Sequence, residues 1–129
     1  MSRRLFLQSL GALLGSLAMP AVVKANQSNF KNLQTSPIAG FQYYQGETLW
    51  SQLSINQTVQ LVREANNKYD NRAVLVAWQG RKLGYIPKLD NAAVSQLLDR
   101  GEKLEAVIAK LQVSSNPWKR VEVEVRWVV

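Results

Sequence analysis

The C-terminal segment of the chain alternates strictly between apolar and charged side chains. It reads Val121-Glu-Val-Glu-Val-Arg-Trp127, with an apolar residue at every second position. Because successive side chains of a β-strand point to opposite faces of a sheet, this pattern predicts a strand with one buried face and one solvated face. Half-buried strands of this kind are typical of antiparallel sheets. We therefore expect a mainly β fold.

Five further segments have the composition and the bounding turns of short strands. We expect strands over residues 37–44, 58–64, 73–78, 82–86 and 104–113, with a hairpin turn at Gln79-Gly80-Arg81. Asn66-Asn67 is expected to form another turn, because asparagine tolerates a left-handed backbone. Residues 47–57 fit neither strand nor helix periodicity and are expected to be a long loop with a short helical turn. The strands together predict a small six-stranded antiparallel barrel of the OB-like or Greek-key type.

A single α-helix is predicted at about residues 89–100. Asp90 is expected to cap its N-terminus, and Leu89 to pack against Val94 as a hydrophobic staple. Apolar residues at positions 94, 97 and 98 form one stripe, as in a helix that lies against a core. Gly101 is expected to end the helix in a left-handed conformation.

The composition excludes several classes of functional site. The 129 residues include no cysteine and no histidine, so the chain has no disulfide, no thiol or imidazole catalyst and no plausible ligand set for structural zinc. It also lacks the Gly-x-x-x-x-Gly-Lys-Ser/Thr loop that binds nucleotide phosphates in ATPases. We therefore expect no metal, no ATP and no other cofactor. Carboxylates such as Glu64 and Asp70 leave one route to catalysis, but nothing indicates a cleft between facing acids. We expect a protein that is not an enzyme.

Residues 1–25 have the order of an export signal. Arg3 and Arg4 precede an apolar stretch that runs to Val23, and Ala25 is the expected cleavage site. The run Ser2-Arg-Arg-Leu-Phe-Leu7 resembles the twin-arginine signal, which implies the twin-arginine export machinery as a partner. The chain would then be periplasmic or extracellular after cleavage, or membrane-anchored if the segment stays uncleaved. Residues 26–36 are expected to be a linker to a domain at 37–129.

The remaining charge and the aromatic residues favour a nucleic-acid partner. Subtracting the three cations of residues 1–25 from the 16 Lys and Arg leaves 13 against 9 Asp and Glu, a net charge of +4. This balance permits a phosphate-bearing ligand without requiring one. Single strands are bound by aromatic rings that stack on bases and by cations that contact the backbone. Rings at expected strand ends or turns have cations within a few residues: Tyr43, Tyr44, Tyr69, Tyr85 and Trp118, near Lys68, Arg72, Lys88, Lys119 and Arg120.

Three motifs resemble the HIRAN domain, a small β-barrel module of fork-remodelling helicases that also occurs as free-standing bacterial proteins. They are Phe41-Gln-Tyr-Tyr-Gln-Gly46, Arg63-Glu-Ala-Asn-Asn-Lys-Tyr-Asp70 and Leu83-Gly-Tyr-Ile-Pro87. The resemblance covers most of residues 37–129 and implies a binding module for nucleic-acid ends. Helicase-attached members grip the 3′-hydroxyl end of a single DNA strand. The ATPase motor and the zinc module of those larger proteins have no counterpart in this chain.

The resemblance also assigns roles to individual residues. It implies that Tyr43 stacks on a base, and that Tyr69 and Asp70 close over the terminal nucleotide. Lys88 matches a phosphate-contacting cation, and Trp118 falls where an aromatic base-stacker would lie. An ionised aspartate only accepts hydrogen bonds, so it would accept one from a free hydroxyl and repel a terminal phosphate.

One position departs from the DNA-binding members of the family. Gln42 stands where they have an arginine, so it can hydrogen-bond a phosphate but supplies no charge. We expect a lower affinity with a weaker salt dependence. The favoured interpretation is an exported, non-catalytic module that binds single-stranded nucleic acid, at 3′-hydroxyl DNA ends. The alternative is an envelope interaction module that binds a protein or a glycan with the same face of the barrel.

Overall fold

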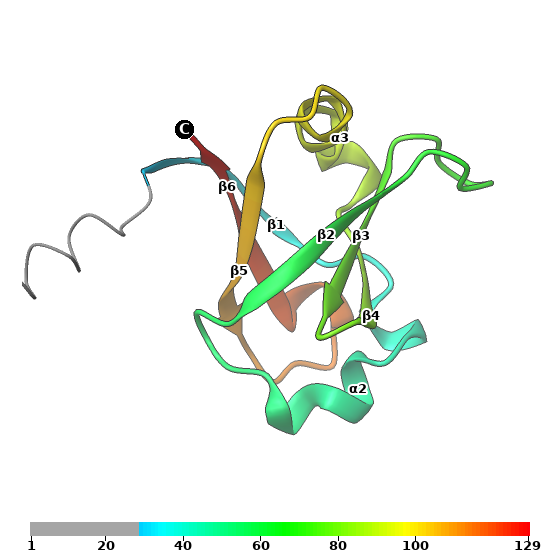
Figure 1. Ribbon diagram of the computed structural model, residues 1–129. Helices are drawn as coiled ribbons and strands as arrows, with labels where there is room; N and C mark the ends of the chain where they lie inside the picture. Colours follow the sequence, from blue (N-terminus) through cyan, green and yellow to red (C-terminus); the bar gives the residue numbers. More distant parts are fainter. Residues whose placement is uncertain (1–28) are drawn as a thin grey trace, which may run out of the picture.

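The computed structural model describes residues 29–129, which form a curved antiparallel sheet with short helices (Figure 1). The export signal expected at residues 1–25, with cleavage at Ala25, lies outside the described residues. Each strand pairs antiparallel with its neighbours, in the order β1-β6-β5-β2-β3-β4. The strands are β1 (Phe30–Pro37), β2 (Thr58–Glu64), β3 (Ala73–Trp78), β4 (Arg81–Tyr85), β5 (Leu104–Leu111) and β6 (Val121–Val128). The predicted mainly β, six-stranded OB-like fold is confirmed.

Short helices fill the connections between the strands. The α-helices are α2 (Gly46–Leu49) and α3 (Ala92–Asp99). The 3-10 helices are η1 (Phe41–Tyr43), η2 (Trp50–Gln52), η3 (Lys88–Asp90) and η4 (Pro117–Lys119). Figure 1 shows α3 at one end of the curved sheet and α2 at the other. Within residues 29–129, no helix has the length and apolar character that a membrane crossing requires.

The two edges of the sheet meet through the segment that follows β1. Ala39 N–H donates to the Tyr85 carbonyl at 2.8 Å, and Tyr85 N–H donates back to Ala39 O at 3.0 Å. Gly84 makes this approach possible, because a Cβ there would lie 2.4 Å from Ala39 O and its φ is 151°. The sheet is therefore curled almost into a barrel, although β1 and β4 themselves do not pair.

The concave side of the sheet encloses the core. Every second residue of β6 from Val121 to Val125 is buried, as the alternation predicted, while Glu122 and Glu124 are partly exposed. Val59 of β2 and the side chain of Phe41 are also buried among them. Burial of such side chains stabilises the fold by about 1.5–3 kcal/mol each.

Two expectations for the N-terminal part are wrong. Residues 30–36, expected to lie in a linker, form β1, which pairs with β6 from Phe30 to Pro37. The strand expected at 37–44 is instead a turn at Gly40, where φ is 76°, followed by η1. β1 is an edge strand whose side chains are mostly exposed, so it carries no apolar alternation that would have revealed it. Phe41 is completely buried, and the chain turns at Gly40 to place it in the core.

The predicted helix exists, but its beginning differs from the prediction. Asp90 belongs to η3, and Asn91 occupies the N-cap position without a side-chain capping bond. Leu89 is 97% exposed, so it does not pack against Val94. The C-terminal prediction is confirmed, because Gly101 has a φ of 80° and the following N–H groups donate to the last helical carbonyls.

The other local predictions have mixed outcomes. The long loop with a short helical turn at 47–57 is confirmed by α2 and η2. The hairpin turn at Gln79-Gly80 is confirmed, with positive φ at both residues, although β4 begins already at Arg81. The strand expected over 104–113 ends at Leu111.

Candidate functional site

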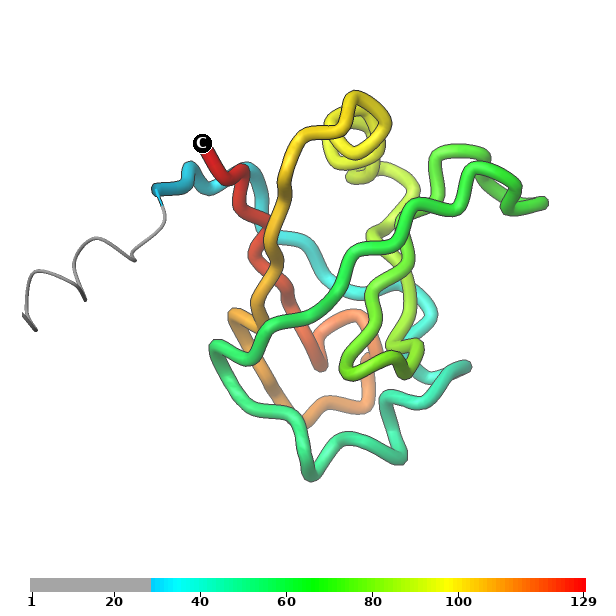
Figure 2. Tube along the Cα trace, viewed as in Figure 1, coloured from blue at the N-terminus to red at the C-terminus, as the bar shows by residue number. Residues whose placement is uncertain are grey.

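The connection between β2 and β3 projects from the barrel as a hydrogen-bonded loop (Figure 2). Asn67 Oδ1 accepts hydrogen bonds from the N–H groups of Tyr69 (2.9 Å) and Asp70 (3.1 Å). The left-handed turn expected at Asn66-Asn67 is therefore wrong, because the asparagine side chain, and not a positive φ, shapes the loop. The loop leaves the ring of Tyr69 89% exposed.

Asp70 fixes this loop to the body of the protein. Its Oδ1 accepts from the N–H of Arg72 at 2.9 Å, and its Oδ2 accepts from Asn91 Nδ2 at 2.7 Å. Partial burial raises the pKa of Asp70, but these two hydrogen bonds and the charges of Lys88 and Arg72 outweigh it and hold the pKa below its ordinary value. Asp70 is therefore ionised at neutral pH. Each oxygen has a second lone pair, which can still accept a hydrogen bond.

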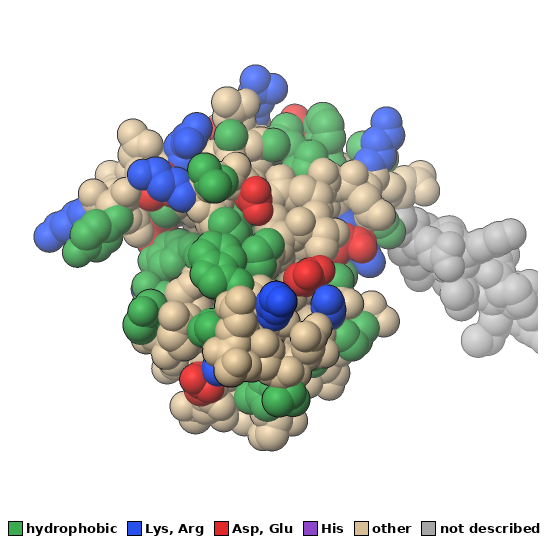
Figure 3. Space-filling model, turned by 180° about the vertical axis from the view of Figure 1, so that it is seen from behind, with side chains coloured by type: hydrophobic (Ala, Val, Ile, Leu, Met, Phe, Trp, Pro, Cys, Tyr) green, Lys and Arg blue, Asp and Glu red, His purple; other side chains and the backbone are tan. Residues whose placement is uncertain are grey.

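A pocket of about 500 Å³ lies between this loop and β4. Its volume is within the range of about 300–1,000 Å³ that is usual for small-ligand sites. Figure 3 shows hydrophobic side chains gathered beside the projecting loop, with Lys and Arg side chains over the loop itself. The pocket combines aromatic, cationic and carboxylate side chains, and its lining is Ala39, Tyr44, Asn67, Tyr69, Asp70, Ala73, Lys82, Tyr85, Ile86 and Lys88.

Two tyrosines and a lysine pack together on the wall of the pocket. The rings of Tyr44 and Tyr85 meet edge to face, with centroids 5.9 Å apart. Lys82 Nζ lies 4.8 Å from the Tyr44 centroid and 5.4 Å from that of Tyr85. Such edge-to-face and cation–π contacts hold rings in place, and these rings can present a surface to a ligand.

Hydrogen bonds connect this wall to the end of β2. The Tyr85 hydroxyl donates to Glu64 Oε1 at 2.8 Å, and Asn67 Nδ2 donates to the same oxygen at 3.1 Å. Lys82 Nζ donates to the Tyr85 hydroxyl at 3.4 Å. Burial raises the pKa of Glu64, but the bonds from Tyr85 and Asn67, with the charge of Lys82, outweigh it and lower the pKa overall. The hydrogen bond to Tyr85 is the main reason that the pKa of Lys82 is raised. Both charges therefore persist at neutral pH.

The residues expected from the sequence form two groups. Tyr69, Asp70 and Lys88 come together at the pocket. Gln42 and Tyr43 lie on η1, outside the pocket lining, and both are exposed.

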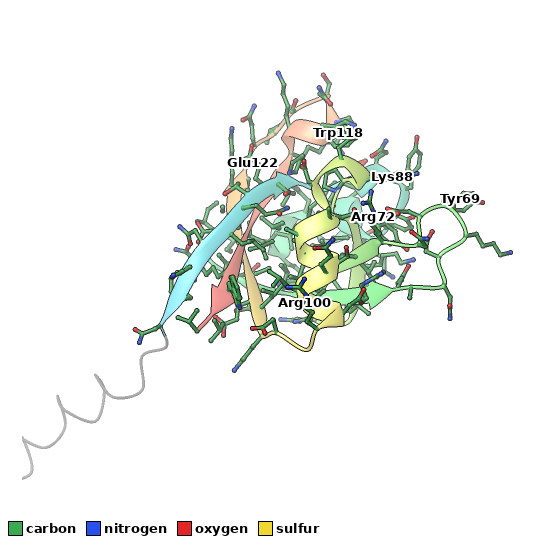
Figure 4. All side chains as sticks on the ribbon, turned by 90° about the horizontal axis from the view of Figure 1, so that it is seen from above. Tyr69, Arg72, Lys88, Arg100, Trp118 and Glu122 are labelled. Atoms are coloured by element: carbon green, nitrogen blue, oxygen red, sulfur yellow. The ribbon has the colours of Figure 1, made fainter. Side chains whose placement is uncertain are left out.

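Trp118 belongs with the second group. It is 51% exposed on η4, which packs against η1. Figure 4 shows Trp118 well apart from Tyr69, which lies on the projecting loop, with Lys88 and Arg72 between them.

The sequence did not identify every residue of the pocket. Strand alternation would have turned one of Tyr43 and Tyr44 into the core, whereas η1 exposes 78% of Tyr43 and 38% of Tyr44. The contributions of Lys82, Tyr85 and Glu64 depend on the cross-strand neighbours in the curled sheet. The proximity of Tyr85 to the HIRAN-like motif was the one signal that pointed to it.

Residues 31–129 match the model of the HIRAN domain family. The chain belongs to this family. HIRAN domains are known as nucleic-acid-binding modules. A comparison with curated proteins finds no match.

Two solved structures resemble this HIRAN domain. A protein from Lactobacillus plantarum is 25% identical, with a TM-score of 0.68 over 79% of this chain and 98% of that one. The HIRAN domain of human HLTF is 22% identical, with a TM-score of 0.58 over 74% of each chain. The likeness to the human domain extends to the fold.

Proposed function

We propose that this HIRAN domain binds single-stranded DNA by its free 3′-hydroxyl end and catalyses no reaction. The observation that carries the proposal is the ionised carboxylate of Asp70 at the pocket, next to the exposed ring of Tyr69. A terminal hydroxyl can donate to the free lone pair of Asp70. A terminal phosphate, which is negatively charged, would be repelled by the same group.

The other groups of the pocket support the rest of a terminal nucleotide. The rings of Tyr44, Tyr69 and Tyr85 offer surfaces for a base, and base stacking contributes about 1–3 kcal/mol per base. Lys82 and Lys88 supply positive charge for the phosphate that precedes the terminal sugar. Two or three such contacts correspond to micromolar affinity, of about −8 kcal/mol.

The second group of residues extends the proposed surface beyond the terminal nucleotide. Tyr43 and Trp118 are exposed rings on neighbouring 3-10 helices, where they can stack on the bases that precede the end. Gln42, next to Tyr43, offers a hydrogen bond but no charge to a phosphate. We therefore expect this part of the surface to contribute little to the salt dependence of binding.

The test is fluorescence anisotropy of the full chain with a short oligothymidine that carries either a 3′-hydroxyl or a 3′-phosphate. We expect clearly tighter binding to the hydroxyl form. Asp70→Asn keeps the shape of the side chain and removes its charge, so the preference should fall towards one. Asp90→Asn removes the same charge from an exposed position outside the pocket, and the preference should persist. An unchanged preference in Asp70→Asn would remove the proposed mechanism.

The alternative ligand is a protein or a glycan of the cell envelope, bound by the same face. The exposed rings favour it, because they can pack on apolar faces of many ligands. It predicts weak DNA binding that is the same for both 3′ ends. Anisotropy on the two oligonucleotides therefore separates it from end recognition.

We also propose that residues 1–25 direct export by the twin-arginine machinery. Replacing Arg3 and Arg4 with lysine keeps the charge but changes the paired arginines. The double variant should remain in the cytoplasm of a bacterial host, whereas the wild type should be found in the periplasmic fraction. Equal periplasmic amounts of the two proteins would contradict twin-arginine export.

A further inference from the structure

The projecting loop lines a second hollow, of about 550 Å³, in addition to the aromatic pocket. It shares Asn67, Tyr69, Asp70 and Lys88 with that pocket. Its remaining lining residues are Lys68, Asn71 and Arg72, which are all polar or charged. The hollow therefore differs from the pocket in chemistry, because Tyr69 is its only aromatic residue.

The hollow holds three cations and one carboxylate. Lys68, Arg72 and Lys88 belong to none of the salt bridges within residues 29–129, which join other residues. The carboxylate of Asp70 already accepts bonds from the Arg72 N–H and from Asn91. Gathered cations that lack counter-charges raise the local positive potential, so the hollow attracts anions.

The positions of these cations suit a phosphate group. Figure 4 shows Arg72 and Lys88 between α3 and the outer part of the loop, where Tyr69 lies. A guanidinium donates two parallel hydrogen bonds to phosphate oxygens, and an ammonium acts as a compact point charge. The loop that positions Lys68 and Arg72 is held by the hydrogen bonds of Asn67 and Asp70.

We propose that this hollow is a second phosphate site, distinct from the aromatic pocket, which takes phosphate groups of a nucleic-acid backbone. The proposal rests on the proposed function, because it adds a contact to the same ligand. The phosphates come from one of two sources. They belong to the strand whose end is bound, or to the opposite strand of a duplex next to that end.

The double variant Lys68→Gln/Arg72→Gln tests the site while leaving the lining of the aromatic pocket unchanged. Its matched control is Arg100→Gln/Lys103→Gln, which removes two exposed cations after α3. The affinity of the full chain is measured at 50 and 200 mM salt for a 3′-hydroxyl single strand and for a duplex with the same strand as a 3′ overhang. Two lost contacts to a single strand should flatten the salt dependence by about 7-fold across this range.

The two substrates identify the source of the phosphates. If the double variant weakens and flattens binding to both substrates, the phosphates belong to the bound strand. If it does so with the overhang duplex alone, they belong to the opposite strand. If it matches the control variant on both, the second phosphate site is refuted, while a retained preference for the 3′-hydroxyl leaves the proposed function standing.

Inorganic pyrophosphate gives a readout that does not depend on nucleic-acid binding. Amide chemical shifts of the full chain should change at Lys68, Arg72 and Lys88 as pyrophosphate is added, and these changes should be lost in the double variant. This result, with no DNA binding, would retain the anion site and reject the proposed function. Shift changes that persist in the double variant, or none at the three residues, would overturn the site.

Discussion

Asp70 and Asn91 couple the projecting loop to the beginning of α3. Asn91 is completely buried, and its Nδ2 donates to Asp70 at 2.7 Å. Its Oδ1 has no hydrogen-bond partner among the described residues. A buried acceptor without a partner costs about 1–3 kcal/mol, which offsets the gain from the bond to Asp70. Asn91 therefore acts mainly to orient Asp70 and to keep it ionised.

Asn91→Ala should raise the pKa of Asp70 towards its ordinary value. In the wild type this pKa lies below 3.8, so the stabilisation from the ionised form is present above about pH 5 and is lost as the pH falls through the native pKa. In the variant that loss should begin at a higher pH, and so should the loss of preference for a 3′-hydroxyl. The measurement is an NMR titration of the Asp70 carboxyl carbon. Identical titrations in the two proteins would contradict the role of Asn91.

Tyr85→Phe isolates the hydrogen bond on the pocket wall from the packing of the ring. The variant keeps the contact with Tyr44 but removes the hydroxyl that donates to Glu64. We expect a loss of about 1 kcal/mol in the free energy of unfolding and an increase in the pKa of Glu64. Urea denaturation measures the first, with Tyr43→Phe, at a 78% exposed ring, as the control. Equal stabilities of the two variants would show that the bond contributes nothing.

At the scale of elements, the predictable ones are those with a clear apolar pattern. β2, β3 and β6 were predicted with nearly the observed bounds, because each buries alternate residues or is buried on both faces. β1 was not predicted, since an edge strand with exposed side chains has no such pattern. η1 was not predicted because it depends on Gly40 and on the burial of Phe41, which are properties of the whole fold. The missed turn is also what exposes Tyr43 and Tyr44 together.

Gly84→Ala should break the contact between the two edges of the sheet. Its Cβ would lie 2.4 Å from Ala39 O, and the backbone φ of 151° adds strain. Backbone strain and overpacking each cost about 1–3 kcal/mol, so we expect a loss of more than about 3 kcal/mol.

Gly80→Ala is the matched control for this element. It also places alanine at a positive φ, of 78°, but no atom lies within 4 Å of the added Cβ. It should cost only about 1–2 kcal/mol. Thermal or urea unfolding of both variants measures the difference, and equal losses would mean that the contact with Ala39 is unimportant.

At the scale of the whole molecule, β1 is an integral part of the domain. It pairs with β6 over its length, and Ser36 at its end is buried. A chain that begins at residue 29 should unfold cooperatively, whereas one that begins at residue 38 should not, because the edge of β6 would be left unpaired. Circular dichroism during thermal unfolding distinguishes them. Cooperative unfolding of the shorter chain would restore the linker interpretation.

The sequence predicts the members of the site better than their arrangement. Tyr69, Asp70 and Lys88 were found from local motifs, and the structure brings them to one pocket. Tyr44 and Lys82 join them through the curl of the sheet, which brings together residues that lie far apart in the chain. Gathering of this kind is a property of the barrel, so no local pattern could have revealed it.

The most direct test of end recognition is a chemical-shift map of the full chain with a thymidine dinucleotide. With a free 3′-hydroxyl, the largest shifts should occur at Tyr44, Tyr69, Asp70 and Tyr85, around the pocket. With a 3′-phosphate, the shift of Asp70 should be much smaller at the same concentration. Equal shifts with both ends, or none at these four residues, would contradict recognition of a 3′-hydroxyl end.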